Sequence, residues 1–359
     1  MIESLLDTYG EGAVLALAGA LVGLLFGASA QHSRFCLRAA TIEVFERRPG
    51  ARMAVWLIVF FTALAVTQLS IMAGLLDVSE ARQMASRGSL SGAILGGALF
   101  GAGMILARGC ASRLLVLSGT GNMRALLTGL VVTLVAQAAY RGVLAPLREE
   151  LSGLWTIEGG AARDLSAILG VSPIAFLVLS ALGLVLAALW AVRAAVPRSQ
   201  SIAALVVGLA VALGWLATFA IASASFEVVP ISSVTFTGPS TDTLMALVAA
   251  PTVALSFGIG LVPGVFLGSG LAALAKGEIQ IERFGPDTPM ERYMIGAVLM
   301  GFGAMLAGGC AVGAGVTGGA VLSITAWIAA ASMWAGALIT QAVMAAVPGV
   351  RPPVRPSSS

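Results

Sequence analysis

The chain contains 359 residues, of which 58% are hydrophobic and only 10% are charged, and its formal net charge is +3. Soluble domains carry about 25% charged residues, so this composition excludes an ordinary soluble domain and predicts an integral membrane protein. The basic residues stand mostly at the ends of apolar segments. That placement is typical of membrane topology and argues against a nucleic-acid partner.

Apolar segments of about 20 residues, the length that crosses a bilayer, recur along the whole chain. We expect an all-α polytopic fold with nine crossings, near 12–33, 53–76, 91–120, 124–147, 168–192, 202–222, 244–275, 293–322 and 324–347. No basic residue precedes the first segment, which does not fit a cleaved signal peptide. The first segment is therefore expected to stay in the mature protein.

The charges of the connecting segments predict the orientation. Segments 41–52 and 192–200 are basic and are expected in the cytoplasm, whereas 148–164 is net acidic and 223–242 has no basic residue, so both are expected outside. This places the N-terminus outside and the C-terminal tail, 348–359, in the cytoplasm.

The stretch "GALFGAGMILARGCA" (97–111) recurs 200 residues later as "AVLMGFGAMLAGGCA" (297–311), and from 101 to 111 seven of eleven positions are identical. Each copy stands third in a set of four crossings, and the two copies run through the membrane in opposite directions. We therefore expect one transporter domain, 1–347, built as an inverted 4+1+4 repeat: 12–147, a linking helix at 168–192, and 202–347. Such repeats are typical of transporters with a substrate site near the membrane midplane.

Both copies are rich in glycine, for which two interpretations stand. Glycine lets helices pack closely, and it also permits breaks in the backbone. In the second interpretation, half-helices meet at Arg108–Gly109–Cys110 and at Gly308–Gly309–Cys310. The next half-helix then begins near Ala111 or Ala311 and directs its N-terminal amides into a cavity suited to an anion.

Two arginines, Arg108 and Arg113, bracket Cys110 in this apolar sequence. Arginine costs about 2.5–3.5 kcal/mol at a helix centre on insertion scales, so both are candidate ligands for an anion. For Arg113 two alternatives stay open: a distant carboxylate partner, or a position at the cytoplasmic boundary.

The same Gly-x8-Cys spacing occurs a third time in "GASAQHSRFC" (27–36), where Arg34 stands two residues before Cys36. Two interpretations of this third motif are equally good: Cys36 has a role in function, or it is simply a buried cysteine beside arginines that determine the topology. The three cysteines lie far apart, without a C-x-x-C motif, so neither a zinc site nor a redox dithiol is predicted.

The contexts "QHSRFCLRAA", "GAGMILARGCASR" and "GFGAMLAGGCAVGAGVTGG" resemble the YeeE/YedE family of membrane sulfur transporters, from about residue 12 to 347. The resemblance implies nine helices, thiosulfate import across the bacterial inner membrane, and a cytosolic sulfur-carrier partner of the TusA/YeeD type. It also implies that Cys36, Cys110 and Cys310 conduct the substrate. Relatives are also linked to selenium metabolism.

The sequence thus predicts a transporter, not an enzyme, that takes up thiosulfate or a related sulfur anion. Neither a cofactor, a metal nor a catalytic residue is expected. The alternatives are a membrane thiol oxidoreductase or persulfide-handling protein, a transporter of a selenium compound, and a membrane anchor for a sulfur-handling enzyme. The candidate substrate-binding residues are Cys36, Cys110, Cys310, Arg108, Arg113, Arg34, Gly109 and Gly309.

Overall fold

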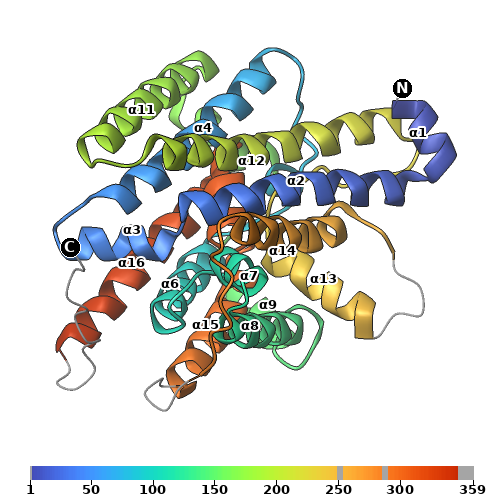
Figure 1. Ribbon diagram of the computed structural model, residues 1–359. Helices are drawn as coiled ribbons and strands as arrows, with labels where there is room; N and C mark the ends of the chain where they lie inside the picture. Colours follow the sequence, from blue (N-terminus) through green and yellow to red (C-terminus); the bar gives the residue numbers. More distant parts are fainter. Residues whose placement is uncertain (1, 249–253, 285–289, 347–359) are drawn as a thin grey trace.

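The computed structural model describes residues 2–248, 254–284 and 290–346, and these residues are almost entirely helical (Figure 1). The helices and strands are α1 (Ile2–Tyr9), α2 (Glu11–Ser33), α3 (Leu37–Phe45), α4 (Ala51–Met72), α5 (Arg82–Ala85), β1 (Gly88–Ser89), α6 (Leu90–Leu106), α7 (Ala111–Gly119), α8 (Met123–Arg141), α9 (Ala145–Gly153), β2 (Thr156–Ile157), η1 (Gly160–Arg163), α10 (Leu165–Leu169), α11 (Pro173–Arg193), α12 (Arg198–Ala224), α13 (Thr237–Val248), α14 (Phe257–Ala275), α15 (Met290–Leu306), η2 (Ala311–Gly318) and α16 (Ile324–Ala346). The strands β1 and β2 pair antiparallel.

Within the described residues, nine helical spans are long and apolar enough to cross a membrane. The all-α polytopic fold predicted from the sequence is therefore confirmed. The spans are Glu11–Phe45, Ala51–Met72, Leu90–Gly119, Met123–Arg141, Pro173–Arg193, Arg198–Ala224, Phe257–Ala275, Met290–Gly318 and Ile324–Ala346.

Several predicted boundaries are wrong. The expected crossing 244–275 is not one helix, because Ser256 caps a new helix, α14, by accepting a hydrogen bond from the Ile259 amide at 3.4 Å. The expected crossing 168–192 begins later, because Gly170 adopts a left-handed conformation and Ser172 caps α11. The tail 348–359 lies outside the described residues.

Helix α2 lies between α12 and α14 and packs closely against both (Figure 1). Glycines make the α2–α14 contact possible: a Cβ atom on Gly23 would lie 2.4 Å from the Leu261 carbonyl oxygen, and one on Gly264 would lie 2.4 Å from that of Ala20. Small residues allow this approach of backbones within a membrane. Close packing by glycine, one of the two interpretations of the glycine-rich sequence, therefore does occur in this fold.

Helices α6 and α15 cross in a reciprocal way. A Cβ atom on Gly96 would lie 2.6 Å from the Gly303 carbonyl oxygen, and one on Gly303 would lie 2.7 Å from that of Gly96. The other pair, Gly103 and Gly296, behaves alike, with corresponding distances of 2.6 and 2.8 Å. Because 96 and 103 become 296 and 303 on adding 200, each helix presents the same positions to the other.

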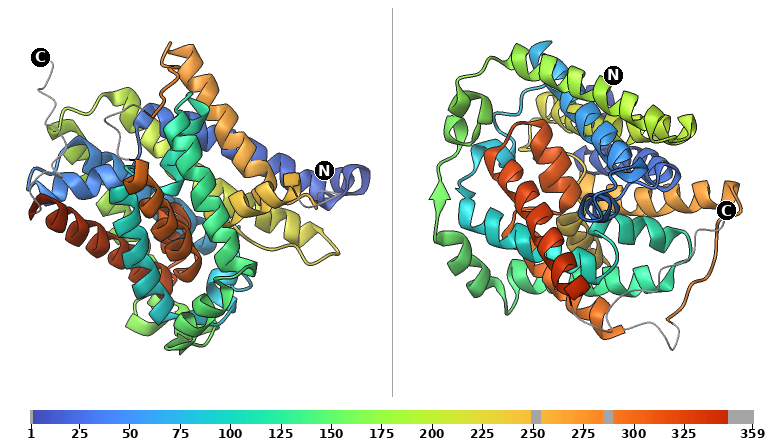
Figure 2. Two further views of the ribbon diagram at one scale, coloured as in Figure 1. Left: turned by 90° about the horizontal axis from the view of Figure 1, so that it is seen from below. Right: turned by 90° about the vertical axis from the view of Figure 1, so that its left-hand side faces the viewer.

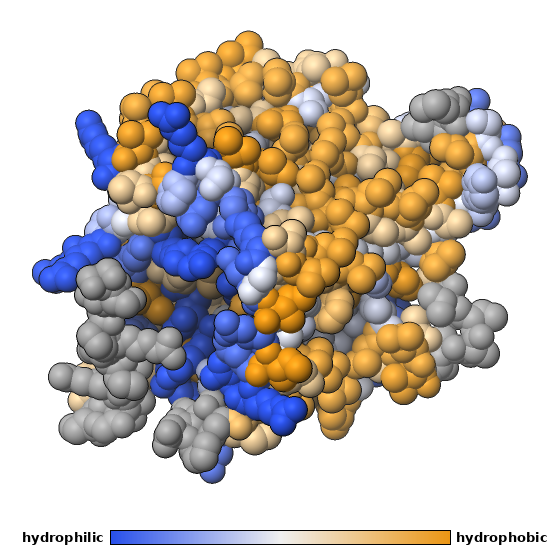
Figure 3. Space-filling model, viewed as in Figure 1, coloured by the Kyte–Doolittle hydropathy of each residue, from blue (hydrophilic) through white to orange (hydrophobic). Residues whose placement is uncertain are grey.

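The outside of the molecule is apolar over large areas. Helix α11 lies at the edge of the fold against α4 (Figures 1 and 2), and it exposes Ile174, Val178 and Leu182. Apolar residues cover the upper and right-hand parts of the face in Figure 3, whereas hydrophilic residues gather on its left. This distribution is that of a protein surrounded by lipid.

Candidate functional site

All three cysteines stand at the same kind of helix break. A residue with positive φ ends one helix: Arg34 (φ 55°), Arg108 (φ 58°) and Gly308 (φ 79°). Two residues later the cysteine is the N-cap of the next helix, which is α3, α7 or η2. The predicted half-helices starting at Ala111 and Ala311 are thus confirmed. The η2 segment is a π-helix, which the sequence analysis did not foresee.

The breaks at Cys36 and Cys110 lie together. Cys36 lines one pocket with Arg108 and Arg113, which flank Cys110 in the chain, and the Cys110 Sγ atom lies 3.3 Å from the Ser112 Oγ atom. Cys110 is buried and Cys36 is partly buried. The third Gly-x8-Cys motif, 27–36, therefore places a second thiol close to the Cys110 break.

Cys36 lines a pocket of about 510 Å³, here called the Arg113 pocket. Its described lining contains five arginines and two glutamates: Arg34, Arg38, Arg52, Arg108, Arg113, Glu278 and Glu282, together with Cys36, Gln31, Ala39, Leu117, Thr120, Asn122, Gly277 and Gln280. Arg34, Arg108, Arg113 and Cys36 were candidate ligands from the sequence, and this pocket brings them together. Arg38 and Arg52 were not among those candidates.

Arg113 is held in place by a polar chain. Its Nη1 atom donates a hydrogen bond to Gln31 Oε1 at 3.2 Å, and Gln31 Nε2 donates to Glu278 Oε2, also at 3.2 Å. Arg113 therefore contacts the Gln31 amide directly, and the nearest acid of this hydrogen-bonded series, Glu278, contacts Gln31 and not Arg113.

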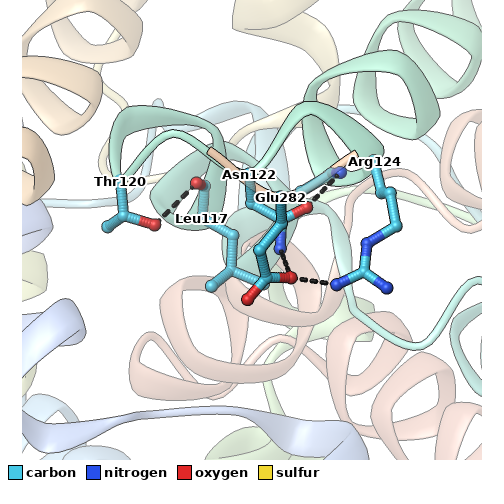
Figure 4. A network of polar contacts seen from close by, with 6 residues as sticks. Leu117, Thr120, Asn122, Arg124 and Glu282 are labelled. Carbon is cyan, nitrogen blue, oxygen red and sulfur yellow. Dashed lines mark hydrogen bonds and ion pairs between the residues drawn. The ribbon is translucent and has the colours of Figure 1, made fainter. Parts of the chain in front are cut away.

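Residues 276–283 follow α14 and lie across the loop between α7 and α8. The Gln280 and Glu282 amides donate to the carbonyls of Thr120 and Gly121 at 3.2 and 3.3 Å. The Glu282 carboxylate accepts hydrogen bonds from Asn122 and Arg124 (Figure 4). Arg124 thus neutralises this acid beside the Arg113 pocket.

Cys310 has different surroundings. It is 1% exposed, and its Sγ atom accepts a hydrogen bond from the Gly313 amide at 3.4 Å. A Cβ atom on Gly309 would lie 2.9 Å from the Ala314 amide nitrogen, whereas the nearest atom to one on Gly109 is a leucine methyl at 3.2 Å. The π-helical turn therefore depends on glycine at 309 more than α7 depends on glycine at 109.

A second pocket, of about 220 Å³ and here called the Arg163 pocket, adjoins the Cys310 break. It is lined by Arg82, Arg87, Arg148 and Arg163, by Gln83, Ser86, Ser89, Ser152, Ser323 and Thr325, and by Gly88, Met305, Leu306, Ala307, Gly308, Gly313, Ala314 and Ala326. None of these described lining residues is acidic. Like the first pocket, it is suited to an anion.

Arg163 is the most buried of these arginines, with 7% of its surface exposed. Its Nη1 atom donates to the Ser86 carbonyl at 2.8 Å and its Nη2 atom to Thr325 Oγ1 at 2.5 Å, while its buried Nε atom has no partner among the described residues. Burial, and secondly the charge of Arg82, lower the pKa of Arg163 to about 10. The side chain is therefore still cationic at neutral pH.

The four arginines of the Arg163 pocket were missed from the sequence. Arg148 and Arg163 belong to a segment that was interpreted only through its net acidic charge, and Arg82 and Arg87 lie in a segment of mixed charge. The sequence did contain a signal for them. Arginines in segments predicted to lie outside are contrary to the positive-inside rule, so their presence there calls for an explanation other than topology.

The two pockets lie at opposite ends of the same spans. Arg52, at the start of α4, lines the Arg113 pocket, and the segment after the end of α4 carries Arg82 of the Arg163 pocket. With 22 residues, α4 is about 33 Å long, which is close to the thickness of the hydrocarbon core. The cysteines thus stand near two basic pockets separated by about one membrane thickness.

A polytopic membrane protein with broken helices and a basic pocket at either end belongs to the class of transporters. A profile of the family described as "Sulphur transport" matches residues 32–339, and the chain belongs to this family. The resemblance to the YeeE/YedE family is thereby confirmed.

Two curated relatives match most of the chain. The "Thiosulfate transporter TsuA" of Escherichia coli (strain K12) is 29% identical over 341 residues, which cover 87% of this chain and 90% of that protein. The "Thiosulfate transporter TsuA" of Spirochaeta thermophila is 29% identical over 332 residues, covering 87% of this chain and 93% of that protein. The family and both relatives are transporters, so the expectation of a transporter and not an enzyme is confirmed.

Proposed function

We propose that this protein takes up thiosulfate, or a closely related sulfur oxyanion, across the bacterial inner membrane. The observation that carries the proposal is the pairing of thiols with arginines at both ends of the spans. Cys36 lines the Arg113 pocket together with Arg108 and Arg113, the two arginines that flank Cys110. Cys310 directly follows the Gly308–Gly309 segment beside the Arg163 pocket. The names of the two relatives agree with this substrate.

The chemistry of the substrate fits these groups. Thiosulfate is a dianion with a soft terminal sulfur at one end and sulfonate-like oxygens at the other. Arginines and helix N-termini attract its charge, and a neutral thiol can donate a weak S–H hydrogen bond to its sulfur. A thiolate would repel the dianion, so the proposed contacts use protonated cysteines and form no stable covalent bond.

The proposed orientation follows the charges of the connecting segments, with the N-terminus outside and the C-terminus in the cytoplasm. The Arg163 pocket then faces outside and receives the anion next to Cys310. The anion passes on to Cys110 and then to Cys36, which is the innermost of the three. Several weak sites in series permit both binding and release.

We also propose that 12–147 and 202–347 form an inverted repeat around the linking helix within one domain, 1–347. The reciprocal α6–α15 contacts of Gly96 with Gly303 and of Gly103 with Gly296 support it. Gly109 and Gly309 hold equivalent places, each directly before a cysteine N-cap, where they let the chain turn into the second half-helix.

On the cytoplasmic side, a sulfur carrier of the TusA/YeeD type is the proposed recipient of the sulfur. Its docking place would be near the Arg113 pocket, where the exposed Arg34 and Arg108 can attract acidic side chains of a partner.

The experiment that tests transport is uptake of labelled thiosulfate by liposomes that contain only this purified protein. Accumulation above that of protein-free liposomes supports the proposal and excludes a mere membrane anchor. Unlabelled selenosulfate, added as a competitor, distinguishes a sulfur transporter from one that prefers selenium compounds. No uptake under an inward thiosulfate gradient would contradict the proposal.

The neighbouring positions of the Cys36 and Cys110 breaks around the Arg113 pocket favour a second candidate function, a membrane thiol oxidoreductase or persulfide-handling protein. In that case turnover would leave a disulfide or a sulfur adduct on a cysteine. Mass spectrometry of the protein after exposure to thiosulfate separates the two candidates. Unmodified thiols after many transport cycles support the proposed passage by hydrogen bonds, and a persistent adduct supports the second candidate.

A further inference from the structure

The end of the segment between α12 and α13 contacts η2 and lies near the start of α7. The Val234 carbonyl accepts a hydrogen bond from Thr317 of η2 at 2.5 Å. The Thr235 side chain covers the first turn of η2, because a Cβ atom on Gly313 would lie 2.2 Å from its Oγ1 atom. The next residue, Phe236, shares the wall of a pocket with Ala111, the first residue of α7.

Phe236 holds the place in the second set of helices that Cys36 holds in the first. Cys36 directly precedes α3, and Phe236, 200 residues later, directly precedes α13. The helices that follow are placed alike: α3 packs against α4 and α16, and α13 packs against α14 and α8. The chain therefore has three cysteines at four equivalent positions, and the fourth position carries an aromatic ring.

This ring is apolar and enclosed. Phe236 is 1% exposed, and its ring centroid lies 5.2 Å from that of Phe26 in α2. An ion that enters such a place loses hydration and gains no hydrogen bond in exchange. A tightly packed apolar constriction is also a known means of closing a permeation path.

An apolar pocket borders the same ring. It has a volume of about 180 Å³, and an apolar cavity of about 150 Å³ is large enough to take up benzene. Its lining comes from α7, α8, α13 and α14 and is mainly apolar, and it includes the buried hydroxyl of Thr237, which has no hydrogen-bond partner among the described residues. The pocket is thus large enough to hold a phenyl ring beside the present position of Phe236.

We propose that Phe236 determines substrate specificity by closing the path between Cys310 and Cys110 with its ring. The inference rests on the proposed transport function and adds to it the residue that rejects other anions. The ring turns into the adjoining apolar pocket only when an anion presents a soft, weakly hydrated sulfur to it. Sulfate has oxygen atoms on every side, keeps its hydration, and is rejected.

The test is uptake of labelled sulfate and of labelled thiosulfate by liposomes containing the wild-type protein, Phe236→Ala or Phe236→Leu. In Phe236→Ala, sulfate uptake should rise about tenfold because the apolar constriction is removed, while thiosulfate uptake persists. Phe236→Leu should give an intermediate ratio of sulfate to thiosulfate uptake, and it replaces the alanine variant if that variant does not fold.

Phe176→Ala is the matched control, since it truncates a buried phenylalanine of a separate core cluster and should leave sulfate excluded. A sulfate rate in the Phe236 variants equal to that of the wild type would overturn the inference. The sulfate measurement tests the role of Phe236 separately from the transport function. Failure of the wild-type protein to carry thiosulfate would instead overturn the proposed transport function.

Discussion

The breaks at Cys110 and Cys310 share the sequence Gly-Cys-Ala, but they obtain positive charge in different ways. At the first break Arg108 itself occupies the left-handed position. At the second break Gly308 occupies that position, and an arginine from another segment reaches it: the Arg82 Nη2 atom donates a hydrogen bond to the Gly308 carbonyl at 3.3 Å.

The two pockets also differ in their acids. The Arg113 pocket includes Glu278 and Glu282, whereas the described lining of the Arg163 pocket has no acidic residue. In the proposed direction of transport, an anion would enter a purely basic pocket and leave through one of mixed charge. A repeated motif therefore fixes the positions of the cysteines, while the surrounding segments fix the electrostatics.

The largest expected effect comes from removing either buried thiol. We expect Cys110→Ala and Cys310→Ala each to lower thiosulfate uptake by liposomes at least about tenfold, the equivalent of ~1.4 kcal/mol, because both are contacts on one path. A loss in only one variant would show that the two breaks are not equivalent. Wild-type uptake in both variants would contradict the proposed use of cysteines.

The source of the positive charge can be tested by comparing Arg108→Gln with Arg163→Gln. A hydrogen bond to a charged group contributes about 1.5–3 kcal/mol, so each substitution should lower the initial rate of uptake by about tenfold or more. Arg198→Gln, at an exposed arginine, is the control. If Arg163→Gln transports like this control, the Arg163 pocket does not receive the substrate.

Much of the fold could be predicted from local sequence, because length and apolarity alone define a membrane span. The break motif was also readable, since Gly-Cys-Ala recurs 200 residues later. The predicted helix boundaries were wrong where a single residue determines the start of a helix. Ser256 is an example, because its side chain caps α14 inside a continuous apolar run.

The site was only half predictable. Residues next to a cysteine in the chain, such as Arg34, Arg108 and Arg113, could be found. For Arg163 the sequence offered only the sign that an arginine stands in a segment predicted outside. Its place beside the Cys310 break depends on contacts with Ser86 and Thr325, which are far away in the sequence. Likewise, the role proposed for Phe236 depends on how α3 and α13 pack, α3 against α4 and α16 and α13 against α14 and α8, which local sequence does not reveal.

The two glycines before the cysteines should differ in their tolerance to substitution. Gly309→Ala places a methyl group against the backbone of η2 and should lower the free energy of unfolding by about 1–3 kcal/mol, as overpacking does. Gly109→Ala meets only a leucine side chain and should cost less. Thermal unfolding of both variants in detergent gives the comparison, and an equal loss would contradict the stronger constraint at 309.

The smallest expected effect concerns the acids of the Arg113 pocket. Glu278 is exposed and accepts a hydrogen bond from Gln31, which in turn holds Arg113. Glu278→Gln removes a negative charge near the arginines and should tighten thiosulfate binding about twofold, since an exposed charge contributes about 0.2–1 kcal/mol. Isothermal titration of the purified protein measures this change.

The control is Glu149→Gln, which removes the exposed partner of Arg148 and should alter the affinity less, because Glu149 is not among the lining residues of either pocket, whereas Glu278 lines the Arg113 pocket. If tighter binding in Glu278→Gln is accompanied by slower turnover, the acids of the Arg113 pocket assist release, because conduction requires that the last site bind weakly enough for the anion to leave. Unchanged affinity and rate would mean that the pockets differ in composition without differing in function.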